Sequence, residues 1–252
     1  MTAAAGDVDG PRSPAMIVFG DSLAYYGPAG GLAADDRHIW PNLVGRRVGL
    51  DVELFARIGW TSRDVWWALT QDPRVWAAIP RAQVIVLAYT GMDSLPSPVP
   101  TALREQIRYI RPPVARRAVR AAYGWVQPRL SPAGWPMALP PKLTVYYLEK
   151  VRSALAAVVP DVPIIAMTPP THVCDAYGHA HPGRDRTTDA VTAWAHRHGI
   201  TLIDPGRITA AHQAVGDTNP DGIHWSLATH REVADEVAPA VADALVMRAG
   251  AR

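Results

Sequence analysis

Short, mostly apolar runs alternate along the chain with segments in which apolar residues recur at helical spacing. Five of the apolar runs are predicted as β-strands: Ala15–Phe19, Val52–Ile58, Val84–Tyr89, Val162–Met167 and Ile200–Ile203. Such runs are typical of parallel strands that are buried on both faces. Helices are predicted for six other segments: Ile39–Val48, Ser62–Thr70, Thr101–Ile110, Thr144–Val159, Thr187–His198 and Leu227–Met247. The alternation predicts an α/β fold of three α/β/α layers around a doubly wound, five-stranded parallel sheet.

Residues that favour helix ends mark several of these boundaries. Thr61 and Ser62 can cap the second helix, Thr144 the fourth and Ser226 the last, because side-chain oxygens accept from the free N–H groups there. Gly199 directly follows the fifth predicted helix, where glycine favours the left-handed conformation that ends a helix.

One segment, residues 96–141, interrupts the alternation. It is rich in proline and arginine, and Glu105 is its one carboxylate. Its place after the third strand favours a lid-like insertion, because open α/β sheets bind ligands beyond the carboxyl ends of their strands. A solvated surface segment is an equal alternative. We expect residues 1–14 to form a flexible tail and residues 15–252 to form one domain that carries this insertion.

Composition narrows the functional class. The 252 residues are 48% hydrophobic, enough for a large core, and the net charge of +2 does not indicate a nucleic-acid partner. The single cysteine, Cys174, excludes an internal disulfide and favours a reducing compartment. The sequence shows no secretory signal pattern and no apolar run of membrane-spanning length. We therefore expect a cytoplasmic enzyme.

Two short motifs at opposite ends of the chain carry the candidate chemistry. Gly20-Asp21-Ser22-Leu23 closes the first strand, and Asp221-Gly222-Ile223-His224 precedes the last helix. Both belong at the carboxyl edge of the predicted sheet. A serine hydroxyl becomes a nucleophile when a base removes its proton, and a histidine oriented by a carboxylate is such a base. The motifs therefore predict acyl transfer, although alone the serine could cap a helix and the histidine could be an ordinary loop residue.

Acyl transfer also needs hydrogen-bond donors for the oxyanion that forms on the carbonyl oxygen. The backbone N–H of Ser22 is one candidate donor, and the N–H of Gly59, after the second strand, is another. A glycine there lets the backbone approach the reacting group, but it also suits an ordinary turn.

Together with Gly91-Met92-Asp93 after the third strand, these motifs resemble the SGNH (GDSL) hydrolase superfamily over most of the chain. The resemblance implies a flavodoxin-like fold, with Ser22 as nucleophile, His224 as base and Asp221 as its orienting group. It also implies an oxyanion hole that includes Ser22 and Gly59.

The third motif departs from the family pattern at Asp93. The family usually has an asparagine there, whose amide is a further oxyanion donor, whereas an ionised carboxylate cannot donate. Asp93 is therefore expected in the site in one of three ways. It is protonated, it is turned away, or Ser94 or a backbone amide supplies the bond instead.

Four longer blocks sharpen the resemblance: Ala24–Pro28, Ile58–Trp67, Gly91–Pro98 and Asn219–Trp225. They resemble mycobacterial sugar acyltransferases of this superfamily. That resemblance implies transfer of an octanoyl group from octanoyl-CoA, as co-substrate, through an acyl-serine to a sugar hydroxyl of diglucosylglycerate, in methylglucose lipopolysaccharide biosynthesis. The residues expected to contact substrate are Asp21, Tyr25, Trp60, Met92, Ser94 and Trp225. Two alternatives remain: an esterase or thioesterase, and a non-catalytic carbohydrate-binding protein.

A polar cluster follows the fourth strand and includes potential metal ligands. Its members are His172, Cys174, Asp175, His179 and His181. Their spacing matches no standard zinc pattern, which favours a polar loop over a metal site. We expect neither a metal nor any cofactor besides the acyl-CoA co-substrate.

Overall fold

The computed structural model describes residues 13–97, 106–134 and 136–250. Its centre is a five-stranded sheet in which every neighbouring pair is parallel. The strands, in their order across the sheet, are β4 (Asp51–Ala56), β1 (Ala15–Gly20), β5 (Ala82–Ala88), β6 (Ile164–Met167) and β7 (Thr201–Ile203). This order is that of a flavodoxin-like doubly wound sheet, so the predicted fold class and all five predicted strands are confirmed.

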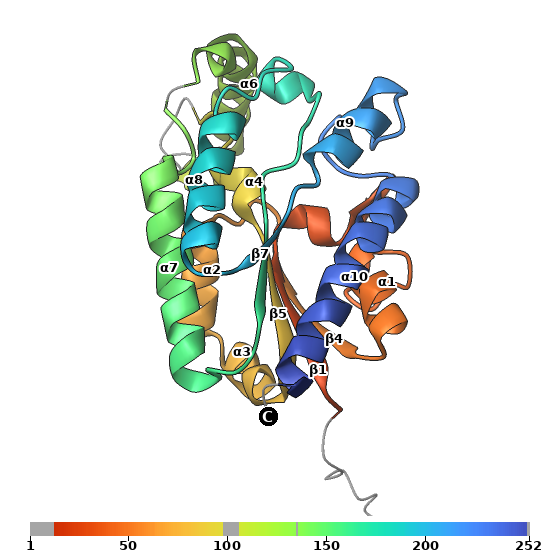
Figure 1. Cartoon of the computed structure of the whole chain (residues 1–252). Helices are drawn as coiled ribbons and strands as arrows, with labels where there is room; N and C mark the ends of the chain where they lie inside the picture. The colour runs from red at the N-terminus through yellow and green to blue at the C-terminus, as the bar shows by residue number, and fades with distance from the viewer. Residues whose placement is uncertain (1–12, 98–105, 135, 251–252) are drawn as a thin grey trace, which may run out of the picture.

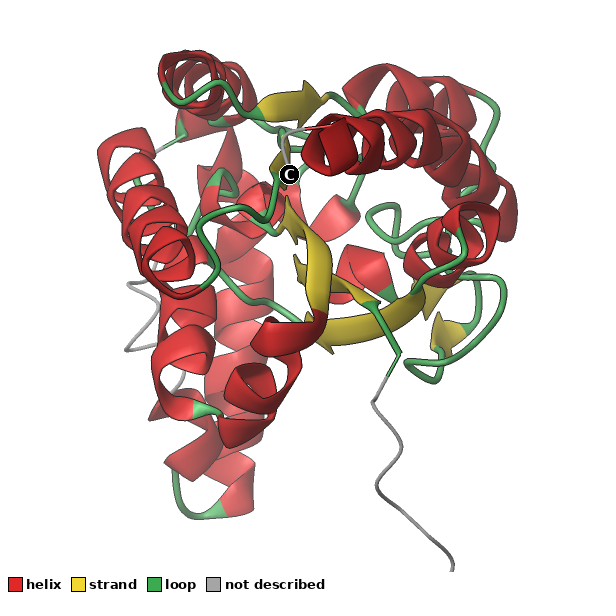
Figure 2. Ribbon diagram, turned by 60° about the horizontal axis from the view of Figure 1, so that its bottom comes forward, coloured by secondary structure: helices red, strands yellow, loops and turns green. Residues whose placement is uncertain are grey.

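Helices cover both faces of the sheet, which gives the three predicted layers (Figures 1 and 2). One face is covered by α1 (Trp40–Val48) and α10 (Leu227–Gly250). The other is covered by α2 (Ser62–Gln71), α3 (Pro73–Ala78), α7 (Pro141–Val158) and α8 (Arg184–Arg197). Five of the six predicted helices are confirmed. Half of the sixth, Thr101–Ile110, lies outside the described residues, and its described half contains a 3-10 turn, Ile107–Tyr109.

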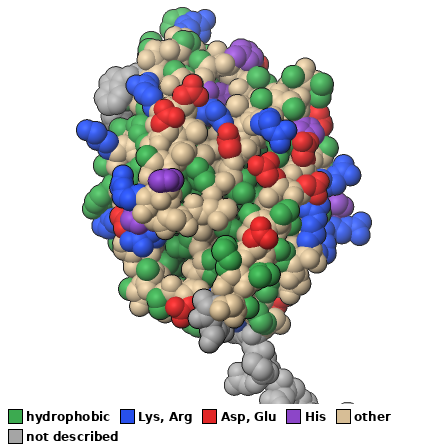
Figure 3. Space-filling model, in the orientation of Figure 1, with side chains coloured by type: hydrophobic (Ala, Val, Ile, Leu, Met, Phe, Trp, Pro, Cys, Tyr) green, Lys and Arg blue, Asp and Glu red, His purple; other side chains and the backbone are tan. Residues whose placement is uncertain are grey.

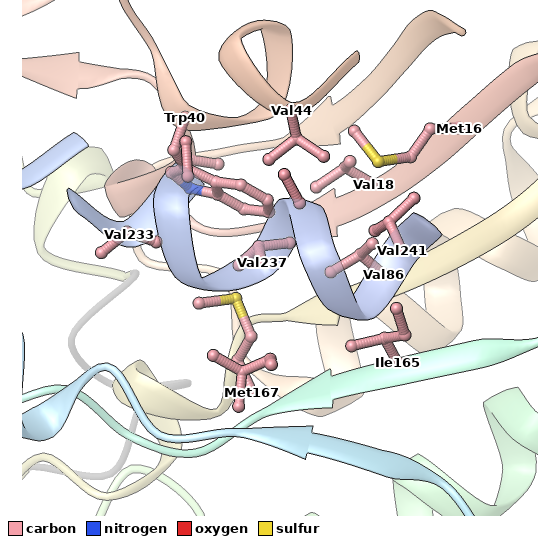
Figure 4. Close-up of a cluster of buried hydrophobic side chains, with 14 of the residues drawn as sticks. Met16, Val18, Trp40, Val44, Val86, Ile165, Met167, Val233, Val237 and Val241 are labelled. Atoms are coloured by element: carbon pink, nitrogen blue, oxygen red, sulfur yellow. The ribbon is translucent and has the colours of Figure 1, made fainter. Parts of the chain in front are cut away.

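The core is divided into two clusters by the alternation of side chains along β1. Met16 and Val18 point to α1 and α10, where they pack with Trp40 and Val237 (Figure 4). The intervening residues of β1 point to the opposite face and pack against α2, α7 and α8. Every residue of β1 is buried, as the apolar run predicts for a central parallel strand.

The helix ends confirm three of the expected signals and correct one. Thr61 precedes α2, and its N–H and hydroxyl both donate to Asp64, at 2.8 and 2.5 Å. The Ser226 hydroxyl accepts from the Thr229 N–H in the first turn of α10, and Gly199 adopts a left-handed φ of 61° after α8. Thr144 does not cap its helix. The helix begins a turn earlier, at Pro141, because proline suits the first helical position.

Besides α3, several elements escaped prediction, and they gather at the carboxyl edge of the sheet (Figure 1). They are the hairpin β2 (Tyr26–Gly27) and β3 (Gly30–Gly31), and the helices α4 (Thr90–Asp93), α6 (Pro113–Leu130) and α9 (Gly206–Ala214). Helix α6 belongs to the proline-rich insertion, and nearly all of its residues are exposed or half-buried.

Charged side chains of both signs are interspersed on the face of the molecule drawn in Figure 3. No helix within the described ranges is long and apolar enough to cross a bilayer.

We expect the buried residues of α7 to contribute strongly to the stability of the fold. Leu148 of α7 is fully buried, so Leu148→Ala should lower the free energy of unfolding by roughly 2–5 kcal/mol through lost burial and a cavity. Leu143 lies on the same helix and is 44% exposed, so Leu143→Ala is a matched control with an expected change within about 0.5 kcal/mol. Urea unfolding measures both, and equal losses would contradict the assignment of this face to the core.

Candidate active site

The candidate site lies where the strands end at the carboxyl edge of the sheet. Ser22 begins a 3-10 turn, Ser22–Ala24, directly after β1, and Gly59 follows β4. Asp93 ends α4, which follows β5. His224 lies in the loop between α9 and α10, after β7. Parallel strands bring these loops together although up to 202 residues separate them along the chain.

Ser22, His224 and Asp221 form a continuous hydrogen-bonded row. The Ser22 Oγ lies 2.9 Å from His224 Nε2, and His224 Nδ1 lies 2.5 Å from Asp221 Oδ2. The other carboxylate oxygen of Asp221 accepts from the N–H groups of Ile223 and His224, both at 3.0 Å. These bonds lower the pKa of Asp221 against the effect of burial, which raises it, and so keep the carboxylate charged. This geometry suits a serine activated by an oriented base.

Two residues that the sequence reasoning missed fix His224 in place. The Tyr26 ring stacks on the imidazole, with the ring centroids 3.9 Å apart and the planes 30° from parallel. The Asn219 amide donates to the carbonyls of Gly27 and Pro28, at 2.8 and 3.0 Å, and so ties the histidine loop to the β2–β3 hairpin. The signal in the sequence was the turn pattern Gly27-Pro28-Ala29-Gly30-Gly31, which predicts a tight connection but not what it packs against.

Asp21 is a buried positioning group rather than a substrate contact. Its side chain is 2% exposed and accepts from the Leu23 N–H at 2.8 Å and from the Met92 N–H. Burial raises its pKa to about 7, although these backbone donors oppose that shift. The carboxyl group thereby links the turn after β1 to the helix after β5. Its expected place among the substrate-binding residues is not supported.

Asp93 is turned away from the expected oxyanion hole. It is fully buried, its carboxylate accepts from the Ser62 N–H at 2.9 Å, and the Ser62 hydroxyl donates to its other oxygen. Burial raises the pKa of Asp93 to about 7, and Ser62 and Thr144 partly oppose that rise. Its two oxygens are therefore used to hold the first turn of α2. A role as oxyanion donor is corrected to a link between α4 and α2.

Of the other residues expected to contact substrate, two lie in the interior. Ser94 is fully buried and its hydroxyl donates to the Gly91 carbonyl, while Trp225 is 3% exposed and packs in the core of the α10 face. Ser94 is thus already hydrogen-bonded in the interior, whereas Trp225 lines a small cavity and its indole N–H has no hydrogen-bond partner among the described residues. Tyr25, Trp60 and Met92 are half-buried at the edge of the site and stay candidates.

Gly59 has the geometry of a residue that only glycine suits. Its φ of 75° lies in the left-handed region, where a side chain would be strained. It lines an open groove together with Met92 and Trp60. Gly59 therefore lies beside an open groove at the carboxyl edge, and its N–H stays a candidate oxyanion donor.

The polar loop after β6 packs around a pair of histidines. The rings of His172 and His181 have centroids 4.5 Å apart, and His181 Nε2 lies 2.7 Å from the Ser94 hydroxyl. Burial lowers the pKa of His172 to about 4 and that of His181 to about 3, so both rings are neutral at pH 7. His179 pairs with Asp175 instead, at 2.9 Å, and Cys174 is buried. Within the described ranges no three such side chains converge on a metal-sized site.

A doubly wound sheet with a serine, histidine and aspartate row at its carboxyl edge defines the class of GDSL-type α/β acyl hydrolases and transferases. The profile of the GDSL-like lipase/acylhydrolase family matches residues 18–232. The chain belongs to that family.

Two relatives match nearly the whole chain, and both are named diglucosylglycerate octanoyltransferase. The protein from Mycolicibacterium hassiacum is 56% identical, and the match covers 92% of this chain and 97% of the relative. The protein from Mycobacterium tuberculosis is 55% identical, with 92% and 94% covered.

Solved structures with low sequence identity share the fold. A lipase/acylhydrolase from Enterococcus faecalis superposes with a TM-score of 0.59 at 12% identity, over 91% of this chain and 95% of that one. An acetyl xylan esterase gives a TM-score of 0.60 at 15% identity, over 90% and 99%. At such identities the likeness concerns the architecture alone.

The link between Asp93 and Ser62 predicts a pH-dependent stability. Because burial raises the pKa of Asp93 from 3.8 to about 7, the folded protein keeps a proton there that the unfolded chain releases. Ionisation of Asp93 is thus a cost to folding that grows as the pH rises from about 4 to about 7. Asp93→Asn removes this cost and keeps an acceptor for the Ser62 N–H.

Unfolding in urea across this pH range provides the measurement. The stability of Asp93→Asn relative to the parent protein should rise from pH 4 to pH 7. Asp189→Asn, at an exposed residue of α8, is the matched control for the substitution itself. A flat difference for Asp93→Asn would show that the carboxyl titrates normally.

Proposed function

We propose that this protein is a serine-dependent acyltransferase that moves an octanoyl group from octanoyl-CoA to a sugar hydroxyl of diglucosylglycerate. The observation that carries the chemistry is the row of short contacts from Ser22 through His224 to Asp221. The choice of donor and acceptor is supported by the names of relatives that are 55–56% identical over nearly the whole chain. The proposal includes a role in methylglucose lipopolysaccharide biosynthesis and a cytoplasmic location, which a CoA thioester donor would support.

In the first step Ser22 is acylated. The Ser22 Oγ attacks the thioester carbonyl carbon while His224 Nε2 takes the hydroxyl proton, and Asp221 holds the opposite ring nitrogen and stabilises the imidazolium. The carbonyl oxygen becomes an oxyanion that accepts from the N–H groups of Ser22 and Gly59. When the carbon–sulfur bond breaks, His224 returns the proton to the departing sulfur, and free CoA leaves an octanoyl-Ser22 ester.

In the second step the acyl group passes to the sugar. His224 removes the proton of an acceptor hydroxyl, whose oxygen attacks the octanoyl-Ser22 carbonyl. The same two N–H groups hold the second oxyanion. The bond to Ser22 Oγ breaks, His224 gives its proton to that oxygen, and the sugar ester leaves with the enzyme restored.

The same groups also suit the alternative functions to different degrees. With water as acceptor they would make an esterase or thioesterase. A non-catalytic carbohydrate-binding role gives no reason for a serine, histidine and carboxylate within hydrogen-bond reach, and Asp93 no longer argues for it because that residue has a structural partner.

Ser22 is expected to be the one serine that reacts with a fluorophosphonate probe, because His224 activates it alone. Ser22→Ala should abolish labelling and lower octanoyl transfer by at least about 10³-fold, with folding retained. Ser153→Ala, at an exposed serine of α7, is the matched control and should label normally. Mass spectrometry locates the adduct. Near-normal turnover by Ser22→Ala would overturn the assignment of the nucleophile.

The transferase is tested by release of CoA from octanoyl-CoA with and without diglucosylglycerate, with the products identified by mass spectrometry. We expect release that depends on the sugar and an octanoylated sugar as product. Equal release in both conditions, with free octanoate, would establish a thioesterase instead. The Ser22→Ala variant supplies the background rate.

A further inference from the structure

An open groove of about 1310 Å³ runs along the open edge of the sheet, and Gly59, after β4, is among its lining residues. β4 is the terminal strand and pairs only with β1 in the sheet, and α2 and α3 form the other wall of the groove. Gly59 and Met92 line the groove near the carboxyl edge, and Arg108 and Tyr177 complete its lining from the insertion and from the loop after β6. Because Gly59 carries a proposed oxyanion donor, the Gly59 end of the groove is the part that concerns the reaction; Ser22, His224 and Asp221 are not among the lining residues.

The lining of the groove suits a carbohydrate better than an alkyl chain. Charged and amide side chains form much of it: Glu53, Arg57, Asp64, Gln71, Asp72, Arg74, Arg81 and Arg108. Two tryptophans lie among them, and Trp67 is 45% exposed although it is a large apolar side chain. Flat aromatic faces beside planar hydrogen-bonding groups suit the apolar faces and hydroxyl rim of a sugar ring.

Some of the arginines that line the groove form ion pairs with carboxylates, and others do not. Arg81 forms an ion pair with Glu53, and Arg74 forms one with Asp72. Arg57 and Arg108 form no ion pair with a carboxylate among the described residues; the guanidinium of Arg108 lies over the Tyr109 ring, 4.9 Å from its centroid. Both are exposed, and Arg57 lies two residues from Gly59. An unpaired guanidinium binds a carboxylate through two parallel hydrogen bonds.

We propose that this groove is the acceptor site, and that it recognises a sugar acid. The sugar rings lie against Trp60 and Trp67, and the carboxylate of the acceptor pairs with Arg57 and Arg108. The assignment rests on the proposed octanoyl transfer, and it adds the groups that select an anionic acceptor. The CoA part of the donor is the poorer fit, because its diphosphate and its 3′-phosphate together need more unpaired cations than the groove offers.

The test compares two acceptors that differ only in charge: diglucosylglycerate and its carboxamide. The parent protein should use the carboxylate with a kcat/KM roughly 10- to 100-fold higher, as expected for a charge-assisted pair. Arg57→Gln and Arg108→Gln should lose most of that preference by lowering kcat/KM for the carboxylate alone. Trp67→Ala should lower kcat/KM for both acceptors alike.

Arg197→Gln is the matched control, because Arg197 is an exposed arginine at the end of α8, at the opposite edge of the sheet. It should keep the preference of the parent protein. Urea unfolding of each variant checks that the substitutions leave the fold intact.

Three outcomes would overturn the groove assignment. The parent protein could show no preference for the carboxylate, the two arginine variants could keep the preference, or they could raise KM for octanoyl-CoA instead, which would place the CoA phosphates there. A separate measurement distinguishes failure of the groove assignment from failure of the proposed function. The protein is mixed with octanoyl-CoA without acceptor, and mass spectrometry detects acylation of Ser22. A parent protein that forms octanoyl-Ser22 and transfers it, but fails the acceptor comparison, retains its function and loses only this site.

Discussion

The complete burial of β1 is the constraint on which the site depends. The strand pairs in parallel with β4 on one side and β5 on the other, and its apolar side chains are buried on both faces of the sheet. Its last residue, Gly20, lies so close to Ala24 that a Cβ there would be 2.7 Å from the Cβ of that alanine. The chain therefore turns sharply after β1 and presents Ser22 at the edge. The position of the candidate nucleophile therefore depends on the packing of β1, the strand that precedes it.

Two buried carboxyl groups join the turns at that edge. Asp21, after β1, accepts from the N–H of Met92 on α4, and the next residue of α4, Asp93, accepts from Ser62 at the start of α2. The loops after β1, β5 and β4 are thus linked in series, and the Gly59 loop leads directly into the helix that Asp93 holds. An asparagine at position 93 could donate to an oxyanion directly. The aspartate instead holds the start of α2, which follows the loop that carries the proposed donor, the backbone N–H of Gly59.

Sequence patterns predicted the parts of the structure that depend on residues close together in the chain. Continuous apolar runs located the strands, and the rule that parallel strands end at one edge brought Ser22 and His224 together before any coordinates were known. Features that depend on distant partners were missed. The stacking of Tyr26 on His224 joins a hairpin of two-residue strands to a loop some 200 residues later, and such strands are too short to show a period. Sequence alone also does not distinguish a buried tryptophan such as Trp225 from an exposed one.

Transfer and hydrolysis share every reacting group, so the difference between them must come from what lies beside the acyl-serine. The His224 side chain is 14% exposed, and Tyr26 covers one face of its ring, which leaves little open surface for a water that approaches the base. The groove beside Gly59 is by contrast wide and polar. An acceptor anchored there by its charge has a high effective concentration at the carbonyl, whereas water gains nothing from the anchor. The sugar is then selected over water because contacts made far from the reacting atoms bind the sugar and hold its hydroxyl near the carbonyl.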